Sequence, residues 1–140
     1  MVDRLVIPSA VADQMLAHAR SEQPNEACGL LSGDLASGRA AEFHSARNLE
    51  ASPLRYNVHP DDLVRIVFGI EDAGDDLIGI FHSHTHTPAV PSATDLRSAQ
   101  YPDAFYVLAS LTDPAAAPAA ALRAWRIRDG LSTEVSLQLD

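Results

Sequence analysis

The sequence has few cysteines, few basic residues and no long apolar run, and each scarcity excludes a class of protein. The single cysteine, Cys28, cannot form an internal disulfide. Lysine and arginine number 10 against 19 aspartates and glutamates, so the net charge of -9 offers no basic surface for nucleic acid or an anionic membrane. No apolar run approaches the ~20 residues needed to cross a bilayer. We therefore expect no nucleic-acid or membrane partner.

The N-terminal stretch MVDRLVIPSA lacks the basic and then apolar layout of a secretion signal, which indicates a cytoplasmic protein. Hydrophobic residues make up 46% of the chain and charged residues 21%, the balance of an ordinary globular protein. A chain of 140 residues suits one domain with a sizeable core. We therefore expect residues 1–140 to form a single domain.

Short elements of changing type follow one another along the chain, without an internal repeat. In the first half, the patterns predict a strand at 4–8, a helix at 10–20 with Ser9 as its N-cap, a hairpin of 29–33 with 41–48, and a helix at 60–74. In the second half, they predict strands at 77–85, 104–111, 121–129 and 132–140, a brief helix at 95–100 and an exposed loop at 113–121. The expected fold is α/β, a mixed sheet flanked by helices.

Three of the six histidines occupy alternate positions in HSHTHTPAVPSATD, residues 82–95. Residues two apart on a strand face the same side, so His82 and His84 present two imidazoles together while Ser83 points away. Neutral imidazole is a good zinc ligand, but a catalytic zinc usually takes three protein ligands. A third ligand is therefore needed.

Two residues compete for the place of that third ligand. His86 would share the face of the histidine pair if the strand continued, yet Pro88 and Pro91 indicate that the chain has left the sheet there. Ser92 can cap a helix, which would put Asp95 in the first turn, directed back toward the end of the strand. Both candidates stay open on these grounds.

Each of these residues also has an ordinary structural explanation. Ser92 and Asp95 have the spacing of a capping box, in which each side chain bonds the other's backbone amide. A histidine pair at a strand end can simply be hydrogen-bonded, and His86 suits a solvated loop. Cys28, beside an apolar strand, behaves most simply as a small buried hydrophobe and not as a nucleophile paired with a histidine. The combination is more specific than its parts.

The spacing H-S-H, seven residues, Ser, two residues, Asp resembles the metal motif of the JAMM, or MPN+, metallopeptidases. The segment PNEACGLLSG, residues 24–33, is similar to the one in which that family carries an upstream glutamate, here Glu26. The resemblance extends over most of the chain. It implies a JAMM/MPN domain whose β-α-β-β-α-β core is like that of the cytidine deaminases.

Carried over residue by residue, the resemblance implies that His82, His84 and Asp95 bind Zn²⁺. It also implies that Glu26 is the acid-base group and that Ser92 steadies the oxyanion. We expect the cap and the oxyanion to compete for the one hydroxyl proton of Ser92. Many members have a proline directly after the second histidine, where this chain has Thr85, so the lip of the groove is expected to differ.

The H-S-H-T start and P-S-x-T-D end look most like the Mec type, which releases cysteine from the tail of a small sulfur-carrier protein. The resemblance implies a zinc metallopeptidase that acts on the C-terminal Gly-Gly tail of a ubiquitin-like or sulfur-carrier protein, in cysteine or cofactor sulfur metabolism. Such a tail could lie extended and add to a sheet edge. The alternatives are a non-catalytic MPN-type binding module, a general zinc peptidase or isopeptidase, and a metallohydrolase that uses His86 and not Asp95.

Overall fold

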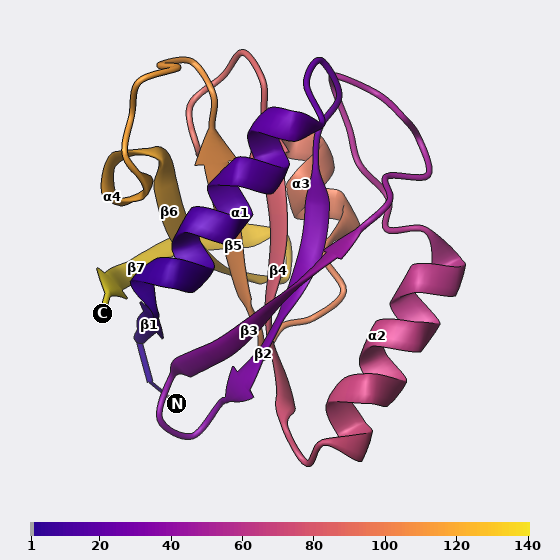
Figure 1. The fold of residues 1–140 in the computed structure, drawn as a ribbon, viewed down its shortest axis with the longest axis vertical. Helices are drawn as coiled ribbons and strands as arrows, with labels where there is room; N and C mark the ends of the chain where they lie inside the picture. Colours follow the sequence, from indigo (N-terminus) through magenta and orange to yellow (C-terminus); the bar gives the residue numbers. More distant parts are fainter. Residues whose placement is uncertain (1) are drawn as a thin grey trace.

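The computed structural model describes residues 2–140, which form a closed, barrel-like sheet of seven strands with helices on two sides (Figure 1). The strands are β1 (Arg4–Ile7), β2 (Cys28–Asp34), β3 (Arg39–Ala46), β4 (Asp76–His84), β5 (Phe105–Ser110), β6 (Leu122–Arg128) and β7 (Leu131–Leu139). The helices are α1 (Ser9–Ser21), α2 (Pro60–Asp72), α3 (Ala93–Ser98) and α4 (Pro118–Ala121). None of these four helices has the length and apolarity to cross a membrane.

The sheet mixes parallel and antiparallel pairs in the order β1-β3-β2-β4-β5-β6-β7. β2 and β3 form the expected antiparallel hairpin, β4 and β5 run parallel, and β6 and β7 form a second hairpin. The parallel pairing of β1 with β7 closes the sheet and brings the two ends of the chain to the same side of the molecule (Figure 1). The predicted mixed sheet with flanking helices is confirmed, and its closure is an additional feature.

Three details of the predicted elements differ from the structure. Pro8, and not Ser9, occupies the N-cap position of α1, because the Pro8 carbonyl already accepts the N–H groups of Val11 and Ala12. The expected loop at 113–121 contains the short helix α4, which begins at Pro118, where proline suits the first turn. The brief helix α3 also begins and ends two residues earlier than the expected 95–100.

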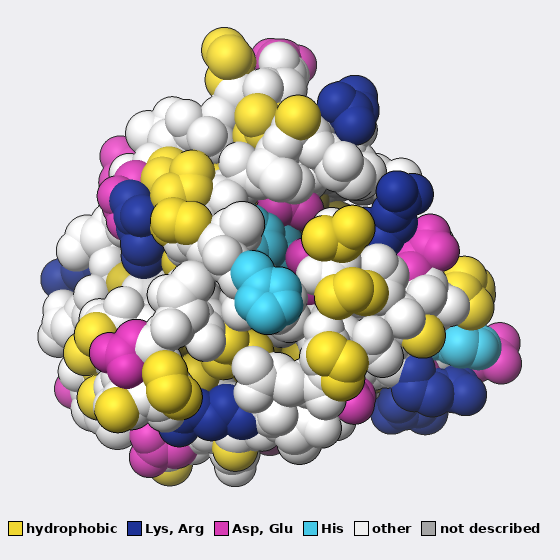
Figure 2. All heavy atoms as spheres, turned by 90° about the horizontal axis from the view of Figure 1, so that it is seen from above, with side chains coloured by type: hydrophobic (Ala, Val, Ile, Leu, Met, Phe, Trp, Pro, Cys, Tyr) yellow, Lys and Arg dark blue, Asp and Glu magenta, His cyan; other side chains and the backbone are white. Residues whose placement is uncertain are grey.

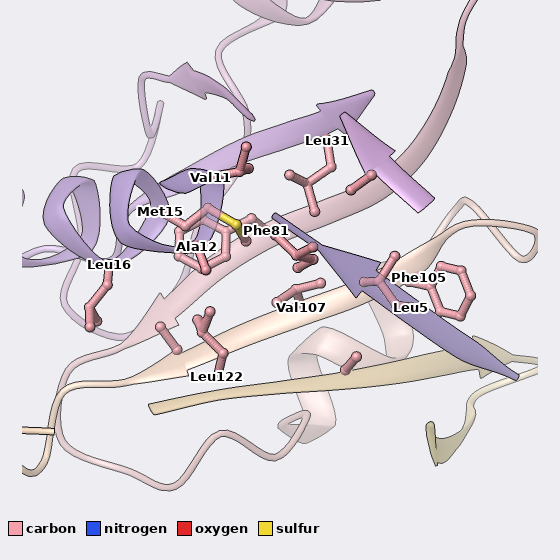
Figure 3. Packing of buried hydrophobic residues seen from close by; sticks show 14 of the residues in the cluster. Leu5, Val11, Ala12, Met15, Leu16, Leu31, Phe81, Phe105, Val107 and Leu122 are labelled. Carbon is pink, nitrogen blue, oxygen red and sulfur yellow. The ribbon is translucent and has the colours of Figure 1, made fainter. Parts of the chain in front are cut away.

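Helix α1 covers one face of the sheet and forms the larger of two apolar cores. Figure 3 shows Val11, Ala12 and Met15 of this helix directed toward Phe81 and Val107 of the two central strands. Met15 and Phe81 are fully buried. Each such large side chain stabilises the fold by about 1.5–3 kcal/mol relative to an exposed one.

The opposite face of β4 carries the second core, beneath α2 and α3, and this face also carries the histidines. A register shift between β2 and β4 resets the alternation near Gly79. Beyond it, Phe81 lies in the α1 core, whereas Ile80 packs with Ile66 of α2 in the second core. His82 is two residues beyond Ile80 on the strand, so it faces the same side.

Candidate metal centre

The end of β4 and the start of α3 bring two imidazoles and one carboxylate together. His82 Nε2 lies 3.3 Å from His84 Nε2, and these nitrogens lie 3.1 and 3.0 Å from Asp95 Oδ2. Both histidines are buried. On the other face of the strand, Ser83 Oγ accepts a hydrogen bond from the Ala27 amide at 2.8 Å. The expected facing of these side chains on the strand is confirmed.

The N-terminal cap of α3 places Asp95. Ser92 Oγ accepts the Asp95 N–H at 3.0 Å, and Asp95 Oδ2 accepts the Ser92 N–H at 2.9 Å, which is the predicted capping box. The expected competition for the hydroxyl proton of Ser92 is wrong, because the cap uses a lone pair on Oγ and leaves the hydrogen to donate elsewhere. Ser92 is also exposed, so a substrate can reach it.

The donor set fits a divalent cation. Two imidazole nitrogens and a carboxylate oxygen form a ligand set typical of zinc, and all three atoms lie within 4.8 Å of one another. His84 Nδ1 can only donate to the Pro88 carbonyl, 2.8 Å away, so a neutral His84 carries its lone pair on Nε2. His82 Nδ1 is buried and has no hydrogen-bond partner among residues 2–140. The His82 ring instead stacks on Tyr56, with ring centroids 4.2 Å apart and planes inclined by 18°.

The charges of the three ligands also suit a cation. Burial lowers the pKa of His82 and favours its neutral form. Burial would raise the pKa of Asp95, but hydrogen bonds with His82 and His84 outweigh it and lower the pKa, so Asp95 is a carboxylate. Burial likewise opposes the charged form of His84, yet bonds with Asp95 and the Pro88 carbonyl raise its pKa. The additional proton of a charged His84 therefore lies on Nε2, and a metal ion would compete with it for that nitrogen.

Glu26, just before β2, is brought to this centre by strand pairing, because Cys28 is in register with His82. Glu26 is only 5% exposed, and its Oε1 has no hydrogen-bond partner in the described part of the chain. Burial raises the pKa of Glu26 to about 7, and the charges of His84 and Asp95 also act on it, in opposite directions. Glu26 therefore lies close enough to interact with His84 and Asp95, and its carboxyl group changes charge near neutral pH.

Two other candidates do not join the site. Cys28 is fully buried, its thiol lies 3.5 Å from the Arg47 carbonyl, and burial raises its pKa to about 12. This thiol packs as a small hydrophobe in the second core. His86 lies beyond the end of β4, is exposed, and does not belong to the cluster of metal-binding groups formed by His82, His84 and Asp95 in residues 2–140.

The irregular segment 48–58, between β3 and α2, was not among the expected parts of the site, and it contributes Tyr56. This segment, α2 and α3 line a half-open pocket of about 380 Å³, which adjoins the metal centre through Tyr56. Its walls include Leu30, Ile80, Leu63, Tyr101, Tyr106 and Thr94, as well as Tyr56 itself. Seen from above, histidine and acidic side chains meet at the centre of this face, in a hollow between groups of hydrophobic side chains (Figure 2).

A family model that describes the prokaryotic homologues of the JAB domain matches residues 8–128, a range that includes Glu26, both histidines and Asp95. The chain belongs to this JAB family. The JAMM/MPN membership expected from the sequence is therefore confirmed, with the fold of that domain.

Individual relatives of this JAB chain are similar over most of its length. It is 42% identical to the CysO-cysteine peptidase of Mycobacterium tuberculosis over 130 residues, 93% of this chain and 87% of that one. It is 38% identical to the desampylase of Haloferax volcanii over 112 residues, 76% of this chain and 81% of that one. A solution structure of a Desulfitobacterium hafniense protein superposes with a TM-score of 0.86 at 32% identity, over 97% of this chain and 92% of that one. The expected enzyme class, a peptidase, is confirmed.

Proposed function

We propose that this JAB domain is a zinc-dependent peptidase that hydrolyses an amide bond at the C-terminal tail of a sulfur-carrier or other ubiquitin-like protein. The observation that carries the proposal is the meeting of His82, His84 and Asp95 beside Glu26, a buried carboxylate without a hydrogen bond at Oε1. The names of the two relatives, a CysO-cysteine peptidase and a desampylase, support the same reaction class.

His82, His84 and Asp95 would hold the zinc ion, two through nitrogen and one through oxygen. Zinc bound there would supply a Lewis acid for the amide carbonyl and would activate water for attack near neutral pH. Asp95 is already ionised and both histidines direct Nε2 at the same point, so little rearrangement is needed. A preformed site of this kind favours tight binding of the ion.

Glu26 would take the proton of the attacking water and return it to the leaving amine. A general acid-base group works best when its pKa lies near the working pH, and burial places the pKa of Glu26 at about 7. Ser92 would donate its free hydroxyl hydrogen to the oxygen of the tetrahedral intermediate while its lone pair continues to cap α3.

The substrate proposal concerns the tail of a small β-grasp carrier, from which the enzyme would release cysteine, another amino acid or a short peptide. The expected addition of that tail to a sheet edge stays a prediction, since β3 pairs with β1 at a single register position, Arg39 with Val6, and most of its outer edge has no strand partner among residues 2–140. The pocket lined by Tyr56, whose ring stacks on His82, is a second place for an extended, glycine-rich segment.

The test incubates zinc-loaded protein with a carrier that ends in cysteine, with an isopeptide-linked ubiquitin-like conjugate, and with unrelated peptides, and identifies the products by mass spectrometry. We expect cysteine release from the carrier. Glu26→Gln should keep the zinc and lose ~10²-fold or more of the activity. Cleavage of the other two substrates without cysteine release would refute the carrier as substrate. Loss of no activity in Glu26→Gln would refute its role, and inertness toward all three substrates would favour a binding module.

A further inference from the structure

The segment 48–58 is attached to the metal centre at several points although it contains neither a helix nor a strand. Its ends meet through an isolated bridge between Asn48 and Val58. Thr85, directly after the second histidine, donates to the Pro53 carbonyl at 3.2 Å. Tyr56 stacks on the ring of His82. The segment therefore contacts the ring of His82 and the residue that directly follows His84.

Asn48 holds this segment in shape by using its whole side-chain amide. Asn48 Nδ2 donates to the carbonyls of Glu26 at 3.1 Å and Arg55 at 3.0 Å. Asn48 Oδ1 accepts the N–H groups of Glu50 at 3.1 Å and Asn57 at 3.0 Å. Two donors and two lone pairs are all that a primary amide offers, so no other side chain of similar size replaces it. One of the four bonds goes to the backbone of Glu26.

Glu26 depends on this segment because its own side chain lacks an anchor at Oε1. Its N–H donates to the Ser52 carbonyl at 2.8 Å, and its carbonyl accepts from Asn48. Segment 48–58 therefore forms hydrogen bonds with the backbone of Glu26 on both sides of its Cα atom. A displacement of about 1 Å in a reacting group can cost ~10²-fold in rate.

We propose that Asn48 is a positioning residue for the peptidase reaction, which fixes segment 48–58 to the backbone of Glu26 and so sets where the Glu26 carboxylate meets the attacking water. The inference rests on the proposed function of Glu26. Asn48 acts through Glu26 and does not touch the substrate.

Asn48→Ala should lower kcat by ~10-fold to ~10²-fold, leave KM within about twofold and keep one zinc per chain. The matched control is Asp34→Ala, which removes another side chain that closes a turn, by accepting the Ser37 N–H at 3.1 Å, at the opposite end of β2. This control should leave kcat unchanged. Equal kcat values for the two variants would overturn the proposal, and so would a change confined to KM.

A double-mutant cycle separates positioning of Glu26 from general loosening of the fold. In a Glu26→Gln background, Asn48→Ala should change the residual rate by less than about threefold, because the group that it positions is already disabled. If the rate reductions of Glu26→Gln and Asn48→Ala instead multiply in the double variant, the proposal is refuted. In metal-free protein, amide exchange at Glu26 should be faster in Asn48→Ala than in Asp34→Ala, and equal rates would also count against it.

If Asn48→Ala does not fold, Thr85→Val decides, because it keeps the shape of the side chain and removes only the bond to Pro53. It should lower kcat by a smaller factor with KM and zinc content unchanged, and an unchanged kcat would overturn the proposal. A wild-type protein that cleaves nothing would instead contradict the proposed function. An active wild type with fully active Asn48 and Thr85 variants would contradict the positioning role alone.

Discussion

Substitutions at Ser92 can separate stability from catalysis, because the cap uses the hydroxyl oxygen and the proposed oxyanion contact would use the hydroxyl hydrogen. The oxygen accepts the Asp95 N–H at 3.0 Å, and the hydrogen has no acceptor in the hydrogen bonds of residues 2–140. Ser92→Ala removes both and should cost about 1 kcal/mol of stability through the lost cap. Its kcat should fall by ~10²-fold to ~10³-fold through the lost oxyanion donor. Ser92→Gly removes the same hydroxyl but should cost only about a few tenths of a kcal/mol, because glycine is tolerated at the N-cap.

The two variants should therefore match in kcat and differ in stability. The free energy of unfolding is measured by urea titration of chelator-treated protein, so that zinc binding does not mask the cap, and kcat is measured on zinc-loaded protein. Ser92→Thr, which keeps a hydroxyl, is the control and should retain most of both quantities. A kcat within about threefold of wild type in both Ser92→Ala and Ser92→Gly would show that Ser92 is a cap and nothing more.

Three further outcomes test the centre and its support. Asp95→Ala should lose the zinc found by elemental analysis and His86→Ala should retain it; the opposite pattern would make His86 the third ligand. Tyr56→Leu should weaken zinc binding by about 10-fold in chelator competition, whereas Tyr56→Phe keeps the stacked ring and should not, and equal affinities would contradict this support of His82. Asp62→Asn should lower the free energy of unfolding at pH 7 by about 1–2 kcal/mol, a modest value because the Arg47 side chain is 62% exposed. Hydrogen bonds from Arg47 lower the pKa of Asp62, so its stabilisation is complete above the unfolded pKa of ~3.9 and fades as the pH falls below it. A difference between Asp62→Asn and wild type that is as large at pH 2 as at pH 7 would refute that origin.

The features that the sequence predicted best depend on short-range rules. Alternation along one strand is enough to put His82 and His84 on the same side, and the spacing of Ser92 and Asp95 is enough to predict a capping box. Each rule spans four residues or fewer and is not overridden by packing. Together they predicted the histidine pair and the cap, whereas the choice of Asp95 over His86 came from the family resemblance.

The features that the sequence did not predict depend on contacts between distant residues. The place of Glu26 follows from the pairing of β2 with β4, and only the family resemblance indicated it. Closure of the sheet requires β1 to pair with β7 from the other end of the chain, which no local pattern encodes. Asn48 and Tyr56 lie in a segment without hydrophobic periodicity, so their roles emerge only from their contacts with Glu26 and His82.

Some buried polar side-chain atoms have no hydrogen-bond partner, and the reason differs from one residue to another. In residues 2–140 they are Glu26 Oε1, His82 Nδ1 and Arg126 Nε, which has only a long ion-pair contact of 4.0 Å with Asp3, and a missing hydrogen bond costs about 1–3 kcal/mol. Arg126 has a structural reason: its other nitrogens donate to the Val2 and Asp103 carbonyls, so one unsatisfied nitrogen accompanies two useful bonds. Glu26 has no such compensation at Oε1. In the proposed reaction this oxygen, which no donor holds, would take the proton from water, and that role would account for a costly buried acid beside the histidines.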